Sequence, residues 1–204
     1  ALDQPVFIDG KFEEGRSLIE VALKSGCEII ESNGKKLYKL NNSHTLSLNY
    51  EGKLVKSKCW LYSLPYSGKL IKIETEKGRK ITDTANHPFV INENGIFVWK
   101  KAELLRVEES LACPKLNVIA RHSNNHNTEV SAGNGALLLA FDSKLYDIVS
   151  ERIVSLEDCN FSGEVYGLVV PGLQNYVGGF GGCGISHNTY PLPEAQSDRF
   201  LIKI

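Results

Sequence analysis

Long stretches of this chain alternate between apolar and polar residues, the period-two pattern of a strand with one buried face. The pattern occurs in Thr45-Leu-Ser-Leu-Asn-Tyr50, Lys69-Leu-Ile-Lys-Ile-Glu74 and Val165-Tyr-Gly-Leu-Val-Val170. Asn-Gly, Glu-Gly and Ser-Gly dipeptides, which favour tight turns, separate these stretches. The sequence therefore predicts a mainly β fold.

Two local features refine this prediction. Ser17 and Glu20 have the spacing of a capping box, apolar residues continue to Leu23, and Gly26 supplies a stop, which predicts one short helix. The segments that begin at Tyr66 and Phe161 both read aromatic, Ser-Gly, charged and then alternating. This weak repeat favours two related lobes with each segment opening a strand, although it is also common turn chemistry.

Charge and composition exclude several classes of function. The 23 basic and 24 acidic residues form no long run of either sign, so no footprint for nucleic acid or an anionic membrane is present. No apolar run approaches the ~18 residues of a membrane span, and the first residues lack the features of a signal peptide. We expect a cytoplasmic monomer without nucleic-acid or membrane partners. The absence of methionine, even at position 1, predicts that the chain starts inside a longer translated product.

The cysteines and histidines give little support for a metal site. The five cysteines, at positions 27, 59, 113, 159 and 183, include no C-x-x-C pair. Cys183 and His187 could form half a site, but a second half is missing. His122 and His126 lie in an Asn-rich stretch, which favours solvated side chains. We therefore expect no metal and no cofactor.

The glycines at 179, 181 and 184 match the G-x-G-x-x-G spacing of a dinucleotide-binding turn. Such a turn holds phosphate because it leads directly into a helix. Pro191 and Pro193 fall where the interior of that helix would lie, so nucleotide binding is not favoured. A ligand-binding loop at 178–184 remains an alternative. We otherwise expect the glycines to lend flexibility to the residues that follow.

Those residues are His187, Asn188 and Thr189. An Asn amide can attack its own main-chain carbonyl and cleave the backbone as a succinimide closes, and favourable intramolecular geometry is equivalent to ~10⁵ to 10⁸ M reactant. The imidazole of His187 could polarise that carbonyl and protonate the leaving amine. The hydroxyl of Thr189 could accept an acyl group. Because His-Asn-Thr also occurs in ordinary surface loops, a second motif is needed.

Thr84-Ala-Asn86-His87-Pro88 supplies it, with a hydroxyl and an imidazole three residues apart at the end of a predicted strand. Together and in this order, the two motifs resemble those of inteins. T-x-N-H-P resembles the N-terminal-junction motif, and His-Asn before a hydroxyl residue resembles the C-terminal junction. Three further segments resemble conserved blocks of the intein family: Leu2–Gly10, Trp99-Lys-Lys-Ala-Glu-Leu and Val165–Val177.

The resemblance implies an all-β HINT (hedgehog/intein) fold, horseshoe-like, with pseudo-two-fold symmetry and one or two short helices. It implies a splicing domain at 1–188 whose polar 120–144 loop, expected to be mobile, stands where larger inteins carry an endonuclease. The chain thus resembles a mini-intein. Residues 189–204 resemble a stretch of MoxR-type AAA ATPases and would be C-extein.

Residue roles also follow from the resemblance. Thr84 and His87 would polarise and twist the N-terminal scissile amide, with assistance from Asn86. After an acyl shift at residue 1 and transfer to Thr189, Asn188 would cyclise with His187 as its acid/base partner. An O-to-N shift would then join the flanking exteins, which are the expected partners.

The sequence departs from the family pattern at three positions. Ala1 has no nucleophile where Cys or Ser is usual, so either a native cysteine was replaced to trap the precursor, which we favour, or the chain belongs to a class that begins with Ala. Gly167 stands where Asp is usual and Gln174 where His is usual. The proton transfers that this Asp and this His would support must therefore be divided among other groups. Gln174 is a candidate site residue.

Two further hypotheses concern the cysteines. Cys27 or Cys59 paired with His87 would make a cysteine protease or transferase that acts on other chains. Cys183, close to the C-terminal junction, is the candidate for a redox sensor.

Overall fold

The structure is a computed structural model that describes residues 4–188 except 33, 116, 118 and 120–146. The candidate residues Ala1 and Thr189, both loop histidines, the 120–144 segment and the 189–204 tail therefore lie outside the described residues. The described elements, in chain order, are β1 (Pro5–Ile8), β2 (Lys11–Glu14), α1 (Gly15–Lys24), β3 (Glu28–Ser32), β4 (Lys35–Lys39), β5 (His44–Leu48), β6 (Leu54–Lys58), β7 (Trp60–Thr75), β8 (Lys80–Thr84), β9 (Pro88–Glu93), β10 (Ile96–Lys101), the 3-10 helix η1 (Ala102–Leu104), β11 (Ser110–Pro114), β12 (Ile148–Val169), β13 (Asn175–Gly178) and β14 (Gly184–His187).

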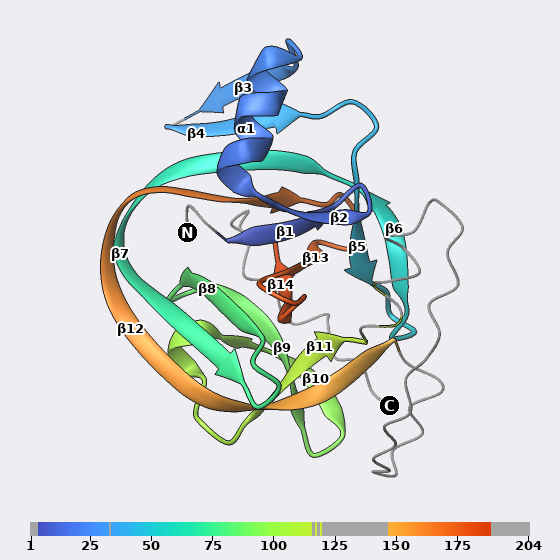
Figure 1. Ribbon diagram of the computed structural model, residues 1–204, viewed down its shortest axis with the longest axis vertical. Coiled ribbons are helices and arrows are strands. Elements are labelled where there is room, and N and C mark those ends of the chain that lie inside the picture. Colours follow the sequence, from blue (N-terminus) through green and yellow to red (C-terminus); the bar gives the residue numbers. More distant parts are fainter. Residues whose placement is uncertain (1–3, 33, 116, 118, 120–146, 189–204) are drawn as a thin grey trace.

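A 12-stranded sheet contains most of the described chain, in the order β2-β1-β13-β14-β9-β11-β12-β7-β4-β3, with β10 paired to β9 and β8 to β7. β5 and β6 form a separate pair. In Figure 1 the long strands β7 and β12 lie side by side and curve around the molecule, with β13 and β14 inside the curve. The predicted all-β fold is confirmed, and each of the three alternating stretches contributes to a strand.

The two copies of the weak sequence repeat occupy matching positions in the fold, although neither copy opens a strand. Both copies lie in the middle of long antiparallel strands, where Ser67 on β7 is paired directly with Ser162 on β12. These two serines are also equivalent positions in the repeat. An antiparallel pair of equivalent residues lies on a two-fold axis, so the pseudo-symmetry of the fold passes through the Ser67–Ser162 pair.

The helix differs from its prediction at its start. It begins at Gly15, with Glu14 as an N-cap that makes no side-chain hydrogen bond, so Ser17 lies inside the helix and the predicted capping box is not formed. Gly15 allows the close packing at this start, because a Cβ there would lie 2.6 Å from Tyr166 Cβ. Gly26 ends the helix as predicted, with φ of +67°. Leu23 is 54% exposed and not part of the core.

The glycine run forms the turn between β13 and β14. Gly179, Gly181 and Gly182 have φ between +66° and +85°, conformations that favour glycine. A strand follows the turn, not a helix, which confirms the argument against a phosphate-binding turn. The turn is packed: a Cβ on Gly182 would lie 2.7 Å from Ile119 Cδ1. The positive φ angles agree with the expectation that glycines let the backbone take an unusual shape here, and the flexibility of the turn stays a prediction.

Three clusters of buried apolar side chains form the core. One packs β1 against β5, β9 and β14, a second lies between β7, β8, β9, β11 and β12, and a third joins α1 to β1, β4, β7 and the end of β12. Of the helices that the structure describes, none is long and apolar enough to cross a membrane.

Candidate active site

The N-terminal motif occupies the tight corner between β8 and β9. Thr84 ends β8 and His87 N donates to its carbonyl oxygen at 2.9 Å, which closes the turn. The Thr84 hydroxyl donates to Asn86 Oδ1 at 2.9 Å. The corner is held from outside by Ala85 N, which donates to Lys69 O, and by His87 O, which accepts from Ala102 N. The predicted position at a strand end is confirmed.

His87 is buried in this corner, with 1% of its surface exposed. Neither ring nitrogen has a hydrogen-bond partner among the described residues, although Nδ1 lies 3.3 Å from Asp83 Oδ1. Burial lowers the pKa of His87, the Asp83 carboxylate opposes that shift, and His187 adds to it. The ring is therefore a neutral imidazole at pH 7 with unused hydrogen-bonding capacity.

The C-terminal motif lies at the end of β14. Asn188 N donates to Gln174 O at 2.8 Å. The Asn188 side chain is held by one residue twice: Oδ1 accepts from Val170 N at 3.1 Å, and Nδ2 donates to Val170 O at 3.0 Å. Both the backbone and the amide of Asn188 are thus fixed.

His187 contacts the carbonyl that an Asn cyclisation would attack. Its Nδ1 lies 2.7 Å from Asn188 O, and because a carbonyl oxygen only accepts, Nδ1 carries the proton. Burial lowers the pKa of His187, and the bond to Asn188 opposes the shift. The edge-on ring of Trp99, at 5.1 Å between centroids, packs against the imidazole. This arrangement orients a donor toward the site of the developing negative charge.

The two motifs are joined through the sheet. Ser186 on β14 pairs with Phe89 on β9, two residues beyond His87. The two histidines are close enough for a charge on His187 to lower the pKa of His87. The fold thus brings both junction motifs to neighbouring strand ends.

Gln174 reaches the junction through its backbone. Its carbonyl accepts from Asn188 N, its own N donates to Val170 O, and its φ is +56°. The side-chain oxygen Oε1 is buried and has no partner among the described atoms. The contact with the junction comes from the main chain of Gln174.

Gly167 is explained by its cross-strand neighbour Tyr62. A Cβ on Gly167 would lie 2.5 Å from the Tyr62 hydroxyl and 2.6 Å from its ring. The phenol thus occupies the space that a side chain at position 167 would fill. An Asp side chain at position 167 would therefore overlap Tyr62 as Tyr62 is placed in this structure.

Burial argues against two of the three cysteines in these hypotheses, whereas Cys27 is partly exposed. Cys59 is fully buried, and burial first and Asp9 second raise the pKa of its thiol to about 12. Such a thiol is not an effective nucleophile near neutral pH. Cys183 is also fully buried, a position that disfavours oxidation from solvent, so its role as a redox sensor stays a prediction.

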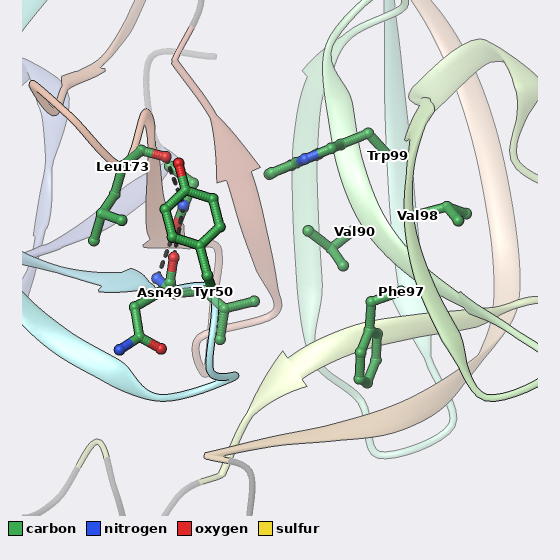
Figure 2. A pocket seen from close by; sticks show the side chains of 9 residues that line it. Asn49, Tyr50, Val90, Phe97, Val98, Trp99 and Leu173 are labelled. Carbon is green, nitrogen blue, oxygen red and sulfur yellow. Dashed lines mark hydrogen bonds between the residues drawn. The ribbon is translucent and has the colours of Figure 1, made fainter. Parts of the chain in front are cut away.

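Sequence reasoning did not assign roles to Val170, Asp83 or Trp99. The two contacts from Val170 are made by its backbone, so its side chain carries no signal. Asp83 precedes Thr84 directly and lies four residues before His87, a spacing that could have drawn attention to it. Figure 2 shows that Trp99 also lines a small apolar pocket between the strand pairs β5–β6 and β9–β10, opposite Leu173.

The long paired strands, the short helix α1 and the two motifs at strand ends define a HINT-type all-β domain. The chain belongs to the intein splicing domain family, whose match covers residues 12–188. The activity of this family is autocatalytic protein splicing, in which the domain acts on its own flanking exteins.

Curated relatives are much longer proteins. The replication factor C small subunit of Methanocaldococcus jannaschii is 34% identical over 131 residues, which covers 63% of this chain and 6% of that protein. A probable translation initiation factor IF-2 of the same organism is 37% identical over 105 residues, or 50% of this chain and 9% of the relative. The chain spans only a small part of each.

Solved structures show the same fold. A KlbA intein precursor from Methanococcus jannaschii matches with a TM-score of 0.70 and 22% identity over 94% of this chain and 92% of the other. The transcription factor IIB Mvu mini-intein matches with a TM-score of 0.69 and 16% identity, covering 92% of this chain and 98% of that chain.

Proposed function

We propose that residues 1–188 form the splicing domain and that Asn188 cyclises onto its own main-chain carbonyl to free residue 189. The observation that carries this proposal is the 2.7 Å contact between His187 Nδ1 and Asn188 O. The family match, which ends at residue 188, supports the same boundary. The 120–144 segment stands at the endonuclease position and is too short for an additional domain.

The chemistry of this step balances within the site. Asn188 Nδ2 bonds to the main-chain carbonyl carbon of Asn188, and the C–N bond to residue 189 breaks. The amide nitrogen loses a proton and the departing amine gains one. His187 Nδ1–H stabilises the negative charge that develops on the carbonyl oxygen and then protonates the departing amine, while Nε2 of the same ring takes up the proton that the amide nitrogen loses, so the imidazole ends neutral. The products are a C-terminal succinimide and a free amino group.

We assign the N-terminal step to the β8–β9 corner. The buried ring of His87, with both nitrogens unpaired among the described residues, is available to bind the scissile amide before residue 1. Thr84 and Asn86 complete this corner through their mutual hydrogen bond. With Cys or Ser at position 1, an acyl shift there and transfer to Thr189 would precede cyclisation, and an O-to-N shift would complete ligation.

Ala1 cannot perform that first shift because it has no nucleophile. We propose that the chain is a precursor trapped by replacement of a native nucleophile. The competing assignment, a class that naturally begins with Ala, is less consistent with Thr189, since Cys usually follows the Asn in that class.

The proposed host is a MoxR-type AAA ATPase, because residues 189–204 resemble a stretch of that family. The curated relatives above have other hosts by name. Cis splicing needs no nucleic acid, membrane, cofactor or second protein, so we propose a cytoplasmic monomer that acts on its own exteins.

The experiment is C-terminal cleavage of the chain as it stands. Mass spectrometry should detect release of peptide 189–204 and a loss of water at residue 188 in the larger product. Asn188→Ala should abolish release, whereas Asn160→Ala, an exposed Asn on β12, should not change it. Equal release from the parent and Asn188→Ala would rule out the proposal.

A further inference from the structure

A buried ion pair lies apart from both junction motifs. Arg79 is 6% exposed and Glu151 is fully buried, and Arg79 Nη2 lies 3.0 Å from Glu151 Oε1. Thr75 donates its hydroxyl to Glu151 Oε2 at 2.9 Å. Burial of two charges is costly, and such pairs are weak evidence of a stabilising role. The splicing steps derived above make no use of this pair.

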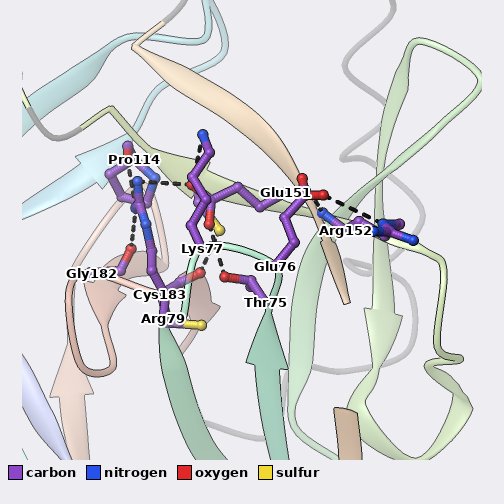
Figure 3. A network of polar contacts seen from close by, with 10 residues as sticks. Thr75, Glu76, Lys77, Arg79, Pro114, Glu151, Arg152, Gly182 and Cys183 are labelled. Atoms are coloured by element: carbon purple, nitrogen blue, oxygen red, sulfur yellow. Dashed lines mark hydrogen bonds and ion pairs between the residues drawn. The ribbon is translucent and has the colours of Figure 1, made fainter. Parts of the chain in front are cut away.

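Arg79 uses its other nitrogen to hold two separate segments. Nη1 donates to Pro114 O at 2.7 Å, at the end of β11, and to Gly182 O at 2.9 Å, in the turn before β14. Figure 3 shows the guanidinium next to these two carbonyls, with Glu151 to its right in this view. Cys113 Sγ donates to Cys183 O at 2.7 Å, which ties the same turn to β11 a second time.

The position of Arg79 relates it to both motifs. Arg79 directly precedes β8, which ends at Thr84, and Gly182 precedes β14, which ends at His187. Lys80 and Phe180 exchange two backbone hydrogen bonds beside the ion pair. One guanidinium therefore fixes the starts of two strands whose far ends carry the junction residues.

The two strands depend on this contact to different degrees. β8 pairs with β7 from Lys80 to Thr84, so the register of Thr84 is set without Arg79. β14 pairs with β9 only at Ser186 and otherwise with its own hairpin partner β13. The turn that joins β13 to β14 is the part that Arg79 holds directly.

We propose that Arg79, neutralised by Glu151, is a positioning residue for the C-terminal step: its bonds to Gly182 and Pro114 hold the β13–β14 hairpin so that His187 stays on the Asn188 carbonyl. This inference rests on the proposed function, because it assigns a role in Asn188 cyclisation. It predicts that loss of these two bonds from Arg79, which we call the Arg79 clamp, slows C-terminal cleavage and spares the N-terminal step.

The test measures the two steps separately, in the full chain behind a short N-extein. The Ala1 chain reports C-terminal cleavage alone. Ala1→Cys combined with Asn188→Ala reports the N-terminal acyl shift alone, as cleavage by added thiol. Arg79→Lys and the apolar pair Arg79→Met with Glu151→Leu are introduced into both, because the apolar pair leaves no unpaired buried charge. Arg152→Ala, which removes the neighbouring exposed ion pairs, is the matched control.

Both clamp variants should lower the rate of C-terminal cleavage by about ten- to a hundredfold, the scale of a small misplacement of reacting groups. Thiol cleavage should change less than about threefold, since the Thr84 register is kept by β7. Arg152→Ala should change neither rate. Equal loss of both rates, or no loss of either, would overturn the positioning role. Failure of both parent reactions would instead overturn the proposed function and this inference with it.

Discussion

His187 Nδ1 lies 2.7 Å from the main-chain carbonyl oxygen of Asn188. The two residues are adjacent, and the side chain of the first is turned onto the peptide group that follows the second. Val170 holds the Asn188 amide at both ends, so the amide that we propose as the nucleophile and the carbonyl that His187 contacts belong to one fixed unit. The following predictions depend on this unit or on the strands around it.

Removal of the imidazole should slow cleavage after Asn188 without unfolding the chain. Loss of a general acid–base group typically reduces rates about 10²- to 10⁴-fold, and we expect His187→Ala to fall in this range. The rate is measured as release of peptide 189–204. A rate within about threefold of the parent would show that the 2.7 Å contact has no part in the reaction.

Acid should destabilise the fold below pH 6.5. Burial lowers the pKa values of both His87 and His187, so the unfolded chain takes up protons at a higher pH than the folded chain. The contribution of the two histidines to the free energy of unfolding is therefore complete above the unfolded pKa of 6.5. It declines as the pH falls toward the pKa values of the folded chain, by at most about 1.4 kcal/mol per pH unit for each histidine. Denaturant unfolding at pH 7.5, 6.5 and 5.5 measures the slope.

His87→Gln should make that slope shallower, because one of the two depressed histidines is gone. An unchanged slope in this variant would show that His87 does not titrate differently in the folded and unfolded chains.

Gly167 and Tyr62 should behave as a coupled pair. Gly167→Asp should destabilise the fold by about 1–3 kcal/mol, because the new side chain overlaps the phenol of Tyr62. Adding Tyr62→Ala should recover most of that loss, which a double-mutant cycle of denaturant unfolding detects. Additive effects of the two changes would refute the mutual exclusion.

Alkylation should separate splicing from cysteine catalysis. Cys59, Cys113 and Cys183 are buried, whereas Cys27 and Cys159 are partly exposed. Iodoacetamide on the folded chain should therefore modify only the two partly exposed thiols and leave release of 189–204 unchanged. Loss of release after modification would favour a cysteine-dependent activity.

The sequence was sufficient for the fold class and for the strand-end location of the Thr84–His87 motif, because alternation and turn residues are local signals. It did not predict that His187 ends a strand. It was not sufficient for contacts set by register. Tyr62 covers Gly167 only because β7 and β12 pair at that offset, and Val170 holds Asn188 through backbone atoms that any residue would supply. The helix start was missed because close packing of Gly15 on Tyr166 outweighed a local capping pattern.

The burial of Arg79 and its contact with Glu151 could not be predicted from the sequence either. A basic Lys-Gly-Arg-Lys run before a strand is typical of an exposed turn, yet Arg79 is buried against Glu151 from a strand far along the chain. Ile153 on β12 pairs with Thr75 on β7, and this long-range pairing brings Glu151 close to the turn that carries Arg79.

The central claim is that this domain splices once position 1 carries a nucleophile. The most direct measurement is mass spectrometry of Ala1→Cys placed behind a short N-extein, with Asn188→Ala as its matched variant. We predict a ligated N-extein–C-extein product and a free domain of residues 1–188, neither of which forms when Asn188→Ala is added. Only intact precursor from Ala1→Cys, with no difference on adding Asn188→Ala, would contradict the account.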